Sequence, residues 1–263
     1  MTPTLSTTAP RIGALLRDWR LRRSLSQLAL AGEAEVSQKH LSFVESGRSA
    51  PSREMVLRLA EAMEIPLRER NALLLAGGFA PLYPERPLDA PEMGPALRVV
   101  QAVLEGHAPF PAIAVDRHWN LVSANAAMTP FLDAVAPSLR QPPVNVLRAS
   151  LHPEGLAPMI LNLPEWRAHI LDRLGREFRQ SYDPAIDALI TELRALPGGL
   201  HPLPTGGTGN IAVPLRLRFG DGVLSFLTTT TVFGTATEVT LSELVIEAFF
   251  PADEATRAAL TGG

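Results

Sequence analysis

The sequence predicts two domains of different fold class: an all-α domain of five short helices, followed by an α+β domain with an antiparallel sheet. Three observations support this prediction. Residues 25–45 hold two short helical patterns around a tight turn, with further helical patterns on both sides. A proline-dense stretch over 79–95 then interrupts the chain. Beyond it, helical patterns give way to three strand-like stretches between residues 211 and 250.

Composition limits the classes of protein that this chain can be. Its 263 residues are 46% hydrophobic, enough for one large domain or two modest ones with a sizeable core. The absence of cysteine excludes disulfides, thiol catalysis, thiolate zinc sites and cysteine redox sensing. No apolar run approaches the ~20 residues of a membrane helix, and the first residues lack a signal-peptide pattern. We expect a cytoplasmic protein with a disordered tail over 1–10.

Charge is distributed unevenly between the two halves of the chain. Residues 1–80 hold 11 Lys or Arg and 8 Asp or Glu, a balance of +3. Residues 81–263 hold 13 and 19, a balance of −6, and the two sum to the net charge of −3. This asymmetry suggests that the first half meets phosphate and the second does not.

Both central helices of the first domain begin at a serine that can cap them, Ser26 and Ser37. The first is expected to end near Ala34 and to pack through small or apolar residues, namely Leu28, Ala31 and Gly32. In the second, Leu41 and Val44 share the dry face. The polar side chains of Gln38, Lys39 and Ser42 then point outward. A short helix with an amide and a cation at its front edge suits a major groove.

The flanking patterns complete five helices. Residues 12–20 repeat apolar positions at helical spacing, with arginines interleaved. Gly47 can end the second central helix in a left-handed conformation. Ser52 caps the next helix, Pro66 separates it from a helix over 67–76, and Gly77 and Gly78 end that one.

The stretch from Ile12 to Gly78 closely resembles the phage-repressor-like (XRE-type) helix-turn-helix domain, as LRDWR, LSQLALA, VSQKHLSFVESGRSAPS and LLLAGG stand in this chain. We place this DNA-binding domain at 11–78. Glu35 departs from the family, which usually has glycine in the turn between the two helices. A left-handed residue other than glycine costs roughly 1–2 kcal/mol, so the turn is either strained or slightly different.

The resemblance implies that the helix over Ser37–Ser46 enters the major groove of an operator. Gln can pair with adenine and Lys with guanine, so the expected base contacts come from Gln38, Lys39, Ser42 and Phe43. Phe43 can touch a thymine methyl or pack against the neighbouring helix instead, and the polar front can be a solvated helix start. The expected phosphate contacts are Gln27, Ser37, His40 and Arg48. Arg20 and Glu45 match a structural ion pair between helices.

Five prolines over 79–95 favour an extended linker, and the second domain is placed at 96–252 with a C-terminal tail over 253–263. A helix is expected over 93–105. Residues 112–132 read as strand, turn, strand and helix, the opening of a PAS-type sensor fold. Helices at 144–151, 165–181 and 184–196, a loop over 198–209 and strands at 211–219, 223–232 and 241–250 follow. We expect helices on one face of the sheet.

This half resembles the ligand-binding domain of MmyB-like transcription regulators, through Trp119 with Ala124-Asn125, then Trp166 and Arg173, then the C-terminal strands. The resemblance covers roughly 95–251. It implies a PAS-like fold around a small apolar or amphipathic molecule, for example a fatty-acid-like one. The chain lacks the His-Pro that the family commonly has before the terminal hairpin, so the identity of the ligand stays open.

Twelve residues of the second domain are candidates for ligand contact. They are Trp119, Asn125, Met128, Phe131, Leu132, Arg148, Trp166, Ile170, Arg173, Phe178, Phe226 and Phe233. The apolar members can equally be plain core. Asn125 can cap a helix instead. The arginines can bind an acidic head group or pair with a local carboxylate, such as Glu177 for Arg173.

No pattern favours catalysis, a metal or a cofactor. The six histidines are scattered without metal-ligand spacing, and the glycine-rich residues 206–210 lack the flanking strand and helix of a phosphate loop. The sequence therefore predicts a DNA-binding transcriptional regulator, not an enzyme, that binds double-stranded DNA as a homodimer and senses a small effector. The alternatives are a DNA-targeted interaction module, a DNA-targeted enzyme and a repressor that needs no ligand.

Overall fold

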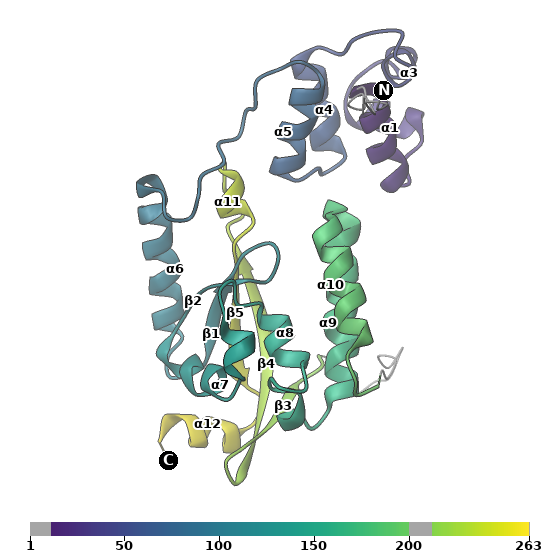
Figure 1. Ribbon diagram of the computed structural model, residues 1–263. Helices are drawn as coiled ribbons and strands as arrows, with labels where there is room; N and C mark the ends of the chain where they lie inside the picture. The colour runs from purple at the N-terminus through teal and green to yellow at the C-terminus, as the bar shows by residue number, and fades with distance from the viewer. Residues whose placement is uncertain (1–11, 200–211, 263) are drawn as a thin grey trace, which may run out of the picture. The chain divides into compact units, whose positions relative to one another are not determined.

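The computed structural model describes residues 12–199 and 212–262 (Figure 1). The tail expected over 1–10 and most of the loop expected over 198–209 lie outside these residues. The chain divides into two compact units, chiefly between Glu85 and Arg86, inside the proline-rich stretch.

The first unit holds five helices: α1 (Ile12–Arg22), α2 (Gln27–Glu33), α3 (Gln38–Glu45), α4 (Arg53–Ala62) and α5 (Leu67–Ala76). Three of them begin at the predicted serine caps. The Ser26, Ser37 and Ser52 hydroxyls accept backbone N–H bonds over 3.0, 3.2 and 3.2 Å, respectively. Each cap satisfies a donor that the first helical turn leaves unpaired. The prediction of five helices is confirmed.

The turn between α2 and α3 contains the non-glycine residue that the sequence marked out. Glu35 has φ +52°, in the left-handed region, so the turn keeps its geometry and carries the strain of a side chain there. Gly47, after α3, has φ +75°, as expected for a helix stop.

The expected packing of α2 was wrong in two positions. Leu30 and Ala31 form its buried side, whereas Leu28 is 67% exposed and Gly32 is exposed. Residues two apart on a helix do not share a face, so the burial of Leu30 turns Leu28 outward. The core of this unit is built from fully buried aliphatic side chains, including Leu16, Leu30, Leu41, Leu59 and Leu74.

The stretch over 79–95 is only partly extended. Its beginning is fixed to α5, because the Asn71 amide oxygen accepts from the backbone N–H groups of Leu82 and Tyr83 at 3.0 and 3.1 Å. The Asn71 amide nitrogen donates to the Tyr83 carbonyl at 2.7 Å. The end of the stretch is helical, with η1 over Pro91–Met93 leading into α6 (Gly94–Gly106).

The second unit is built on one antiparallel sheet in the order β2-β1-β5-β4-β3. Its strands are β1 (Ala112–Val115), β2 (Leu121–Ala124), β3 (Leu215–Phe219), β4 (Gly222–Val232) and β5 (Val245–Pro251). β3 and β4 form the predicted hairpin, with Phe219 paired to Gly222. Between β2 and β3 the chain forms short turns of 3₁₀ helix and the helices α7 (Thr129–Asp133), α8 (Val146–Leu151), α9 (Leu163–Ser181) and α10 (Pro184–Ala195).

Helices lie on both faces of this sheet, which corrects the expectation of one covered face (Figure 1). Ala112 and Ala114 of β1 pack with α6, through Val100 and Leu104. The alternate residues of β1 pack into the larger cluster, together with α7 to α10. Strand residues alternate between faces, so a strand covered on both sides is apolar at every position, as β1 is.

The residues expected as a C-terminal tail include a helix, α12 (Glu254–Thr261). The Asp253 side chain caps it by accepting from the Thr256 N–H at 2.8 Å. The Thr256 hydroxyl, fully buried, accepts from the Ser225 N–H of β4 at 2.9 Å. α12 is therefore part of the second unit. A short helix, α11 (Val239–Ser242), precedes β5.

Candidate nucleic-acid interface and ligand cavity

Close contact between α1 and α3 fixes the position of the predicted recognition helix. A Cβ atom added at Gly13 would lie 2.1 Å from the Val44 carbonyl oxygen. No side chain fits at that distance, so only glycine allows the two backbones to approach this closely. Leu41 and Val44, the residues predicted for the dry face of α3, are buried on this side.

A buried ion pair reinforces that contact, as the sequence predicted. Arg20 Nε and Nη2 donate to the two carboxylate oxygens of Glu45 at 2.6 and 2.8 Å. This two-pronged geometry is the strongest form of an arginine–carboxylate pair. Arg20 Nη1 also donates to the Leu25 carbonyl at 2.9 Å, so one side chain of α1 holds both α3 and the start of the α2 segment.

Gln27 belongs to the same network. Its amide Nε2 donates to Glu45 Oε2 at 2.8 Å. Burial raises the pKa of Glu45, but the hydrogen bonds from Arg20 and Gln27 and the nearby arginine charges outweigh burial, so the pKa lies below its usual value. Gln27 was predicted to contact phosphate. One of its two amide N–H groups serves Glu45, and only the other is left for that role.

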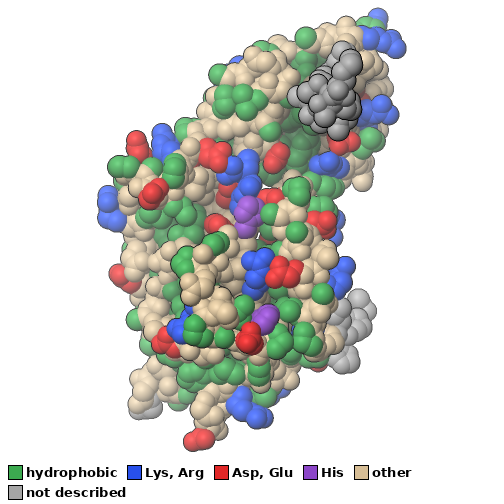
Figure 2. All heavy atoms as spheres, in the orientation of Figure 1, with side chains coloured by type: hydrophobic (Ala, Val, Ile, Leu, Met, Phe, Trp, Pro, Cys, Tyr) green, Lys and Arg blue, Asp and Glu red, His purple; other side chains and the backbone are tan. Residues whose placement is uncertain are grey.

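The opposite side of α3 is polar and open. Ser37, Gln38, Lys39 and His40 are exposed, and so is Arg48 just beyond the helix. In the space-filling view, Lys and Arg side chains lie over the part of this unit where α1 and α3 run (Figure 2). These residues therefore share one accessible edge.

Ser42 and Phe43 continue that edge and are half-buried. Lys39 Nζ lies 5.8 Å from the centroid of the Phe43 ring, and the Arg48 guanidinium carbon lies 5.7 Å from it. Both distances suit cation–π attraction. The ring thus holds two cations beside the helix front, a role that neither sequence alternative for Phe43 included.

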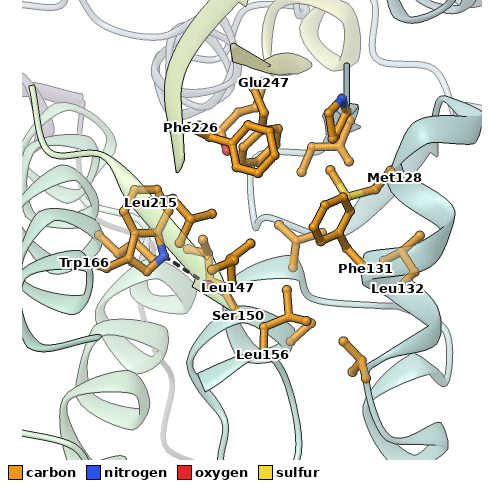
Figure 3. Close-up of a pocket in the computed structure, with 18 residues that line it drawn as sticks. Met128, Phe131, Leu132, Leu147, Ser150, Leu156, Trp166, Leu215, Phe226 and Glu247 are labelled. Carbon is orange, nitrogen blue, oxygen red and sulfur yellow. Dashed lines mark hydrogen bonds between the residues drawn. The ribbon is translucent and has the colours of Figure 1, made fainter. Parts of the chain in front are cut away.

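The larger cluster of the second unit contains an apolar cavity (Figure 3). Its volume is ≈ 80 Å³. In Figure 3, Trp166 lies on the left of the cavity and Phe131 on the right. Glu247 and Phe226 lie at the top of the view, and Leu156 lies at the bottom. Six predicted ligand residues line it: Met128, Phe131, Leu132, Trp166, Ile170 and Phe226.

Two other predicted residues line a smaller adjoining cavity, Trp119 and Arg173. The Arg173 guanidinium lies 4.3 Å from the Trp119 ring centroid. It donates to Glu177 Oε1 at 3.2 Å, the partner that the sequence offered as the alternative to a ligand. It also donates to Glu247 and, at 3.2 Å, to the Thr230 hydroxyl. Arg173 is therefore bound within the protein.

The remaining four predicted ligand residues line neither cavity. The Asn125 side chain accepts from the Ala112 N–H at 3.0 Å and donates to the Leu104 and Phe110 carbonyls at 3.0 and 2.8 Å. It is a buried structural link, and it does not cap the following helix.

Arg148 pairs with Glu192 at the surface, over 2.7 and 2.8 Å. Phe178 packs at the edge of the larger cluster, and Phe233 packs in the cluster on the α6 side of the sheet. Arg148, Phe178 and Phe233 thus have roles in packing and pairing within the unit.

Sequence reasoning missed the two polar groups of the main cavity, the Ser150 hydroxyl and the Glu247 carboxyl. Ser150 Oγ accepts from Trp166 Nε1 at 3.1 Å. Glu247 could have been found, because strand residues alternate in facing. Val245 and Phe249 pack in the cavity cluster and Ile246 packs on the other face, so Glu247 faces the cavity side.

No cluster in the described residues suggests catalysis or a metal. Across 12–199 and 212–262, no group of three or more His, Asp or Glu side chains is arranged to hold a metal ion. In the same residues, no helix has the length and apolar character needed to cross a membrane.

Comparison with protein families divides the chain into the same two parts. Residues 97–261 match the model of the MmyB-like transcription regulator ligand binding domain, and residues 11–73 match that of a helix-turn-helix domain. A comparison with curated proteins finds no match. The two matched ranges fall on the two units that the fold separates.

Proposed function

Since the chain belongs to the family of MmyB-like transcription regulators, and is a DNA-binding regulator with a ligand-sensing domain, we propose that α3 enters the major groove of an operator. Gln38 and Lys39 then read base edges, with Ser42 and Phe43 beside them. Ser37, His40, Arg48 and the second amide N–H of Gln27 contact phosphates. The observation that supports this most is the exposed polar edge of α3, opposite the Arg20–Glu45 pair.

A single helix of eight residues reads few base pairs. We therefore propose that the protein binds as a homodimer, with two half-sites roughly 34–36 Å apart. The effector favours one arrangement of the two DNA-binding domains by binding one state more tightly than the other.

The effector that we propose is a small apolar molecule in the main cavity. An apolar lining with few polar groups is typical of ligand sites. The cavity of ≈ 80 Å³ is smaller than the ~150 Å³ of an apolar cavity that admits benzene. A larger ligand must therefore displace lining side chains, and Met128, an unbranched side chain, can move at the least cost.

The DNA-binding proposal is tested with an operator selected from random DNA by the wild-type protein. Replacing both Gln38 and Lys39 by Ala should reduce the affinity ratio between this operator and scrambled DNA by at least about tenfold. Most of the affinity for scrambled DNA should remain. Replacing Arg48 by Ala should instead weaken both DNAs alike and lower the salt slope by about one.

A matched control is Arg194→Ala, which removes an exposed cation from α10 of the second unit. It should leave both DNA affinities unchanged. Full discrimination by the Gln38→Ala/Lys39→Ala variant would refute the base-reading roles. Native mass spectrometry before and after denaturing extraction tests the dimer and any bound effector together.

A further inference from the structure

The chemistry of the main cavity restricts which ligand it accepts. Among its described lining residues, the only ionisable side chain is an acid, Glu247. The other polar groups are the Ser150 hydroxyl and the Trp166 indole N–H, which are hydrogen-bonded to each other. A fatty-acid carboxylate placed in this cavity would therefore meet a carboxyl group and no lining cation. This argument rests on the proposed role of the cavity as the effector site.

The cation beside Glu247, Arg173, already has partners within the protein. Arg173 lines the smaller cavity, where its Nη1 donates to Glu247 Oε1 and its other nitrogens donate to Glu177 and Thr230. The second oxygen of Glu247, Oε2, receives no hydrogen bond from the residues that the structure describes. Burial raises the pKa of the Glu247 carboxyl above its usual value, and the charge and hydrogen bond of Arg173 offset only part of this rise.

The other titratable group of the smaller cavity is His169. Burial lowers its pKa, and the charges of Arg173 and Arg176 lower it further, so the ring is neutral at neutral pH. It therefore supplies no positive charge for an anionic ligand. Glu247 lines both cavities and is the ionisable group that they share.

We propose that the cavity selects apolar ligands whose polar end donates a hydrogen bond, as a hydroxyl or an amine does, to Glu247, and that it discriminates against carboxylates. The free oxygen of Glu247 accepts this bond, while Arg173 keeps the other oxygen occupied.

The test uses four probes of one chain length with the full-length protein: hexanol, hexylamine, hexanoate and methyl pentyl ether. The ether is an isomer of hexanol that accepts hydrogen bonds but cannot donate them. Calorimetric titration at neutral pH should show hexanol and hexylamine binding about tenfold more tightly than the ether or hexanoate, since one donated hydrogen bond is lost.

A variant tests whether Glu247 is responsible. Glu247→Gln keeps the size of the side chain and releases Arg173 Nη1 from its carboxylate. The affinity for hexanoate should then rise about tenfold, and the affinity for hexylamine should fall by a similar factor. The matched control is Glu192→Gln, which removes a carboxylate from the surface pair with Arg148. It should change neither of these affinities.

The outcomes separate the two proposals. If hexanoate or the ether binds the wild type as tightly as hexanol does, the proposed selection for hydrogen-bond donors is wrong, while the cavity remains the proposed effector site. No binding of any probe up to its solubility limit would overturn the effector site and the rule with it. Should Glu247→Gln fail to fold, the four probes on the wild type still decide.

Discussion

The two domains hold their functional residues in opposite ways. The candidate DNA-reading residues lie on an exposed edge of α3, and buried polar contacts behind that edge fix the helix. The candidate effector residues lie inside the larger apolar cluster, around a space that the cluster does not fill. In the first domain, close packing positions the candidate site. In the second, a gap in the packing forms the candidate site.

This difference predicts different responses to substitution. Removing a buried polar partner in the first domain should destabilise it strongly, because the remaining charge is left without compensation. In the second domain, small changes of volume at the cavity should be tolerated, because neighbouring atoms have room to accept them. Four predictions test this contrast, in order of decreasing effect.

Glu45→Ala should have the largest effect. It leaves Arg20, which is 7% exposed, without its carboxylate partner. Breaking a buried pair costs roughly 3–5 kcal/mol, so the free energy of unfolding of the first domain should fall by about that amount in urea denaturation. A double variant, Arg20→Met with Glu45→Leu, should recover most of the loss, since both buried charges are then gone. A mild effect of Glu45→Ala alone would show that the pair is dispensable.

The same pair should give the first domain a dependence on acidic pH. The pKa of Glu45 is lowered in the folded state, so the stability it contributes is present above its usual value of about 4.5. That contribution is lost as the pH falls through the lowered folded-state pKa. Unfolding of the wild type followed below pH 4.5 should therefore be steeper with pH than that of Glu45→Gln. If the stability of the wild type and that of Glu45→Gln fall with pH in parallel, Glu45 is not the group responsible.

The first domain could be predicted from sequence almost completely, for physical reasons. Its helix ends are marked by Ser26, Ser37 and Ser52, whose hydroxyls act within three residues. Such local signals are visible in a sequence. The error at Leu28 was a choice of the wrong face. Leu28, Ala31 and Gly32 fit helical spacing, but so do the buried residues Leu30, Ala31 and Ala34, and a helix of only two turns does not distinguish the two faces.

The second domain was predicted in outline, and its cavity was not. Phe131 lines the cavity and Phe178 only packs at the edge of its cluster, yet both are aromatic residues at helical spacing. A periodic pattern indicates which face is buried, and it contains no information about whether the buried space is filled. Helix α12 was missed because its cap, Asp253, is separated from the last strand by only one residue.

Two glycine substitutions test how closely α1 and α3 must approach. Gly13→Ala places a Cβ 2.1 Å from the Val44 carbonyl oxygen, so the helices must separate. We expect a loss of about 1–3 kcal/mol, the usual cost of overpacking. Gly32→Ala on α2 has no atom within 4 Å of its new Cβ and should stabilise the domain by up to about 1 kcal/mol. Chemical denaturation of both variants gives the comparison, and equal effects would rule out the close approach.

The smallest effect tests the cavity directly, by adding one methylene group to each domain. Val56 of α4 is fully buried in the first domain, and Val135 is 2% exposed at the wall of the cavity. Val56→Ile should destabilise its domain by about 1 kcal/mol or more, because a filled core has no room. Val135→Ile extends into open space and buries apolar surface worth about 0.8 kcal/mol. The free energy of unfolding of the second domain should therefore rise, and by less than the amount that Val56→Ile removes from the first. Thermal unfolding of both variants measures the two changes. If Val135→Ile destabilises as much as Val56→Ile, the cavity is closed to an added methylene, and the contrast between a filled and an unfilled interior fails.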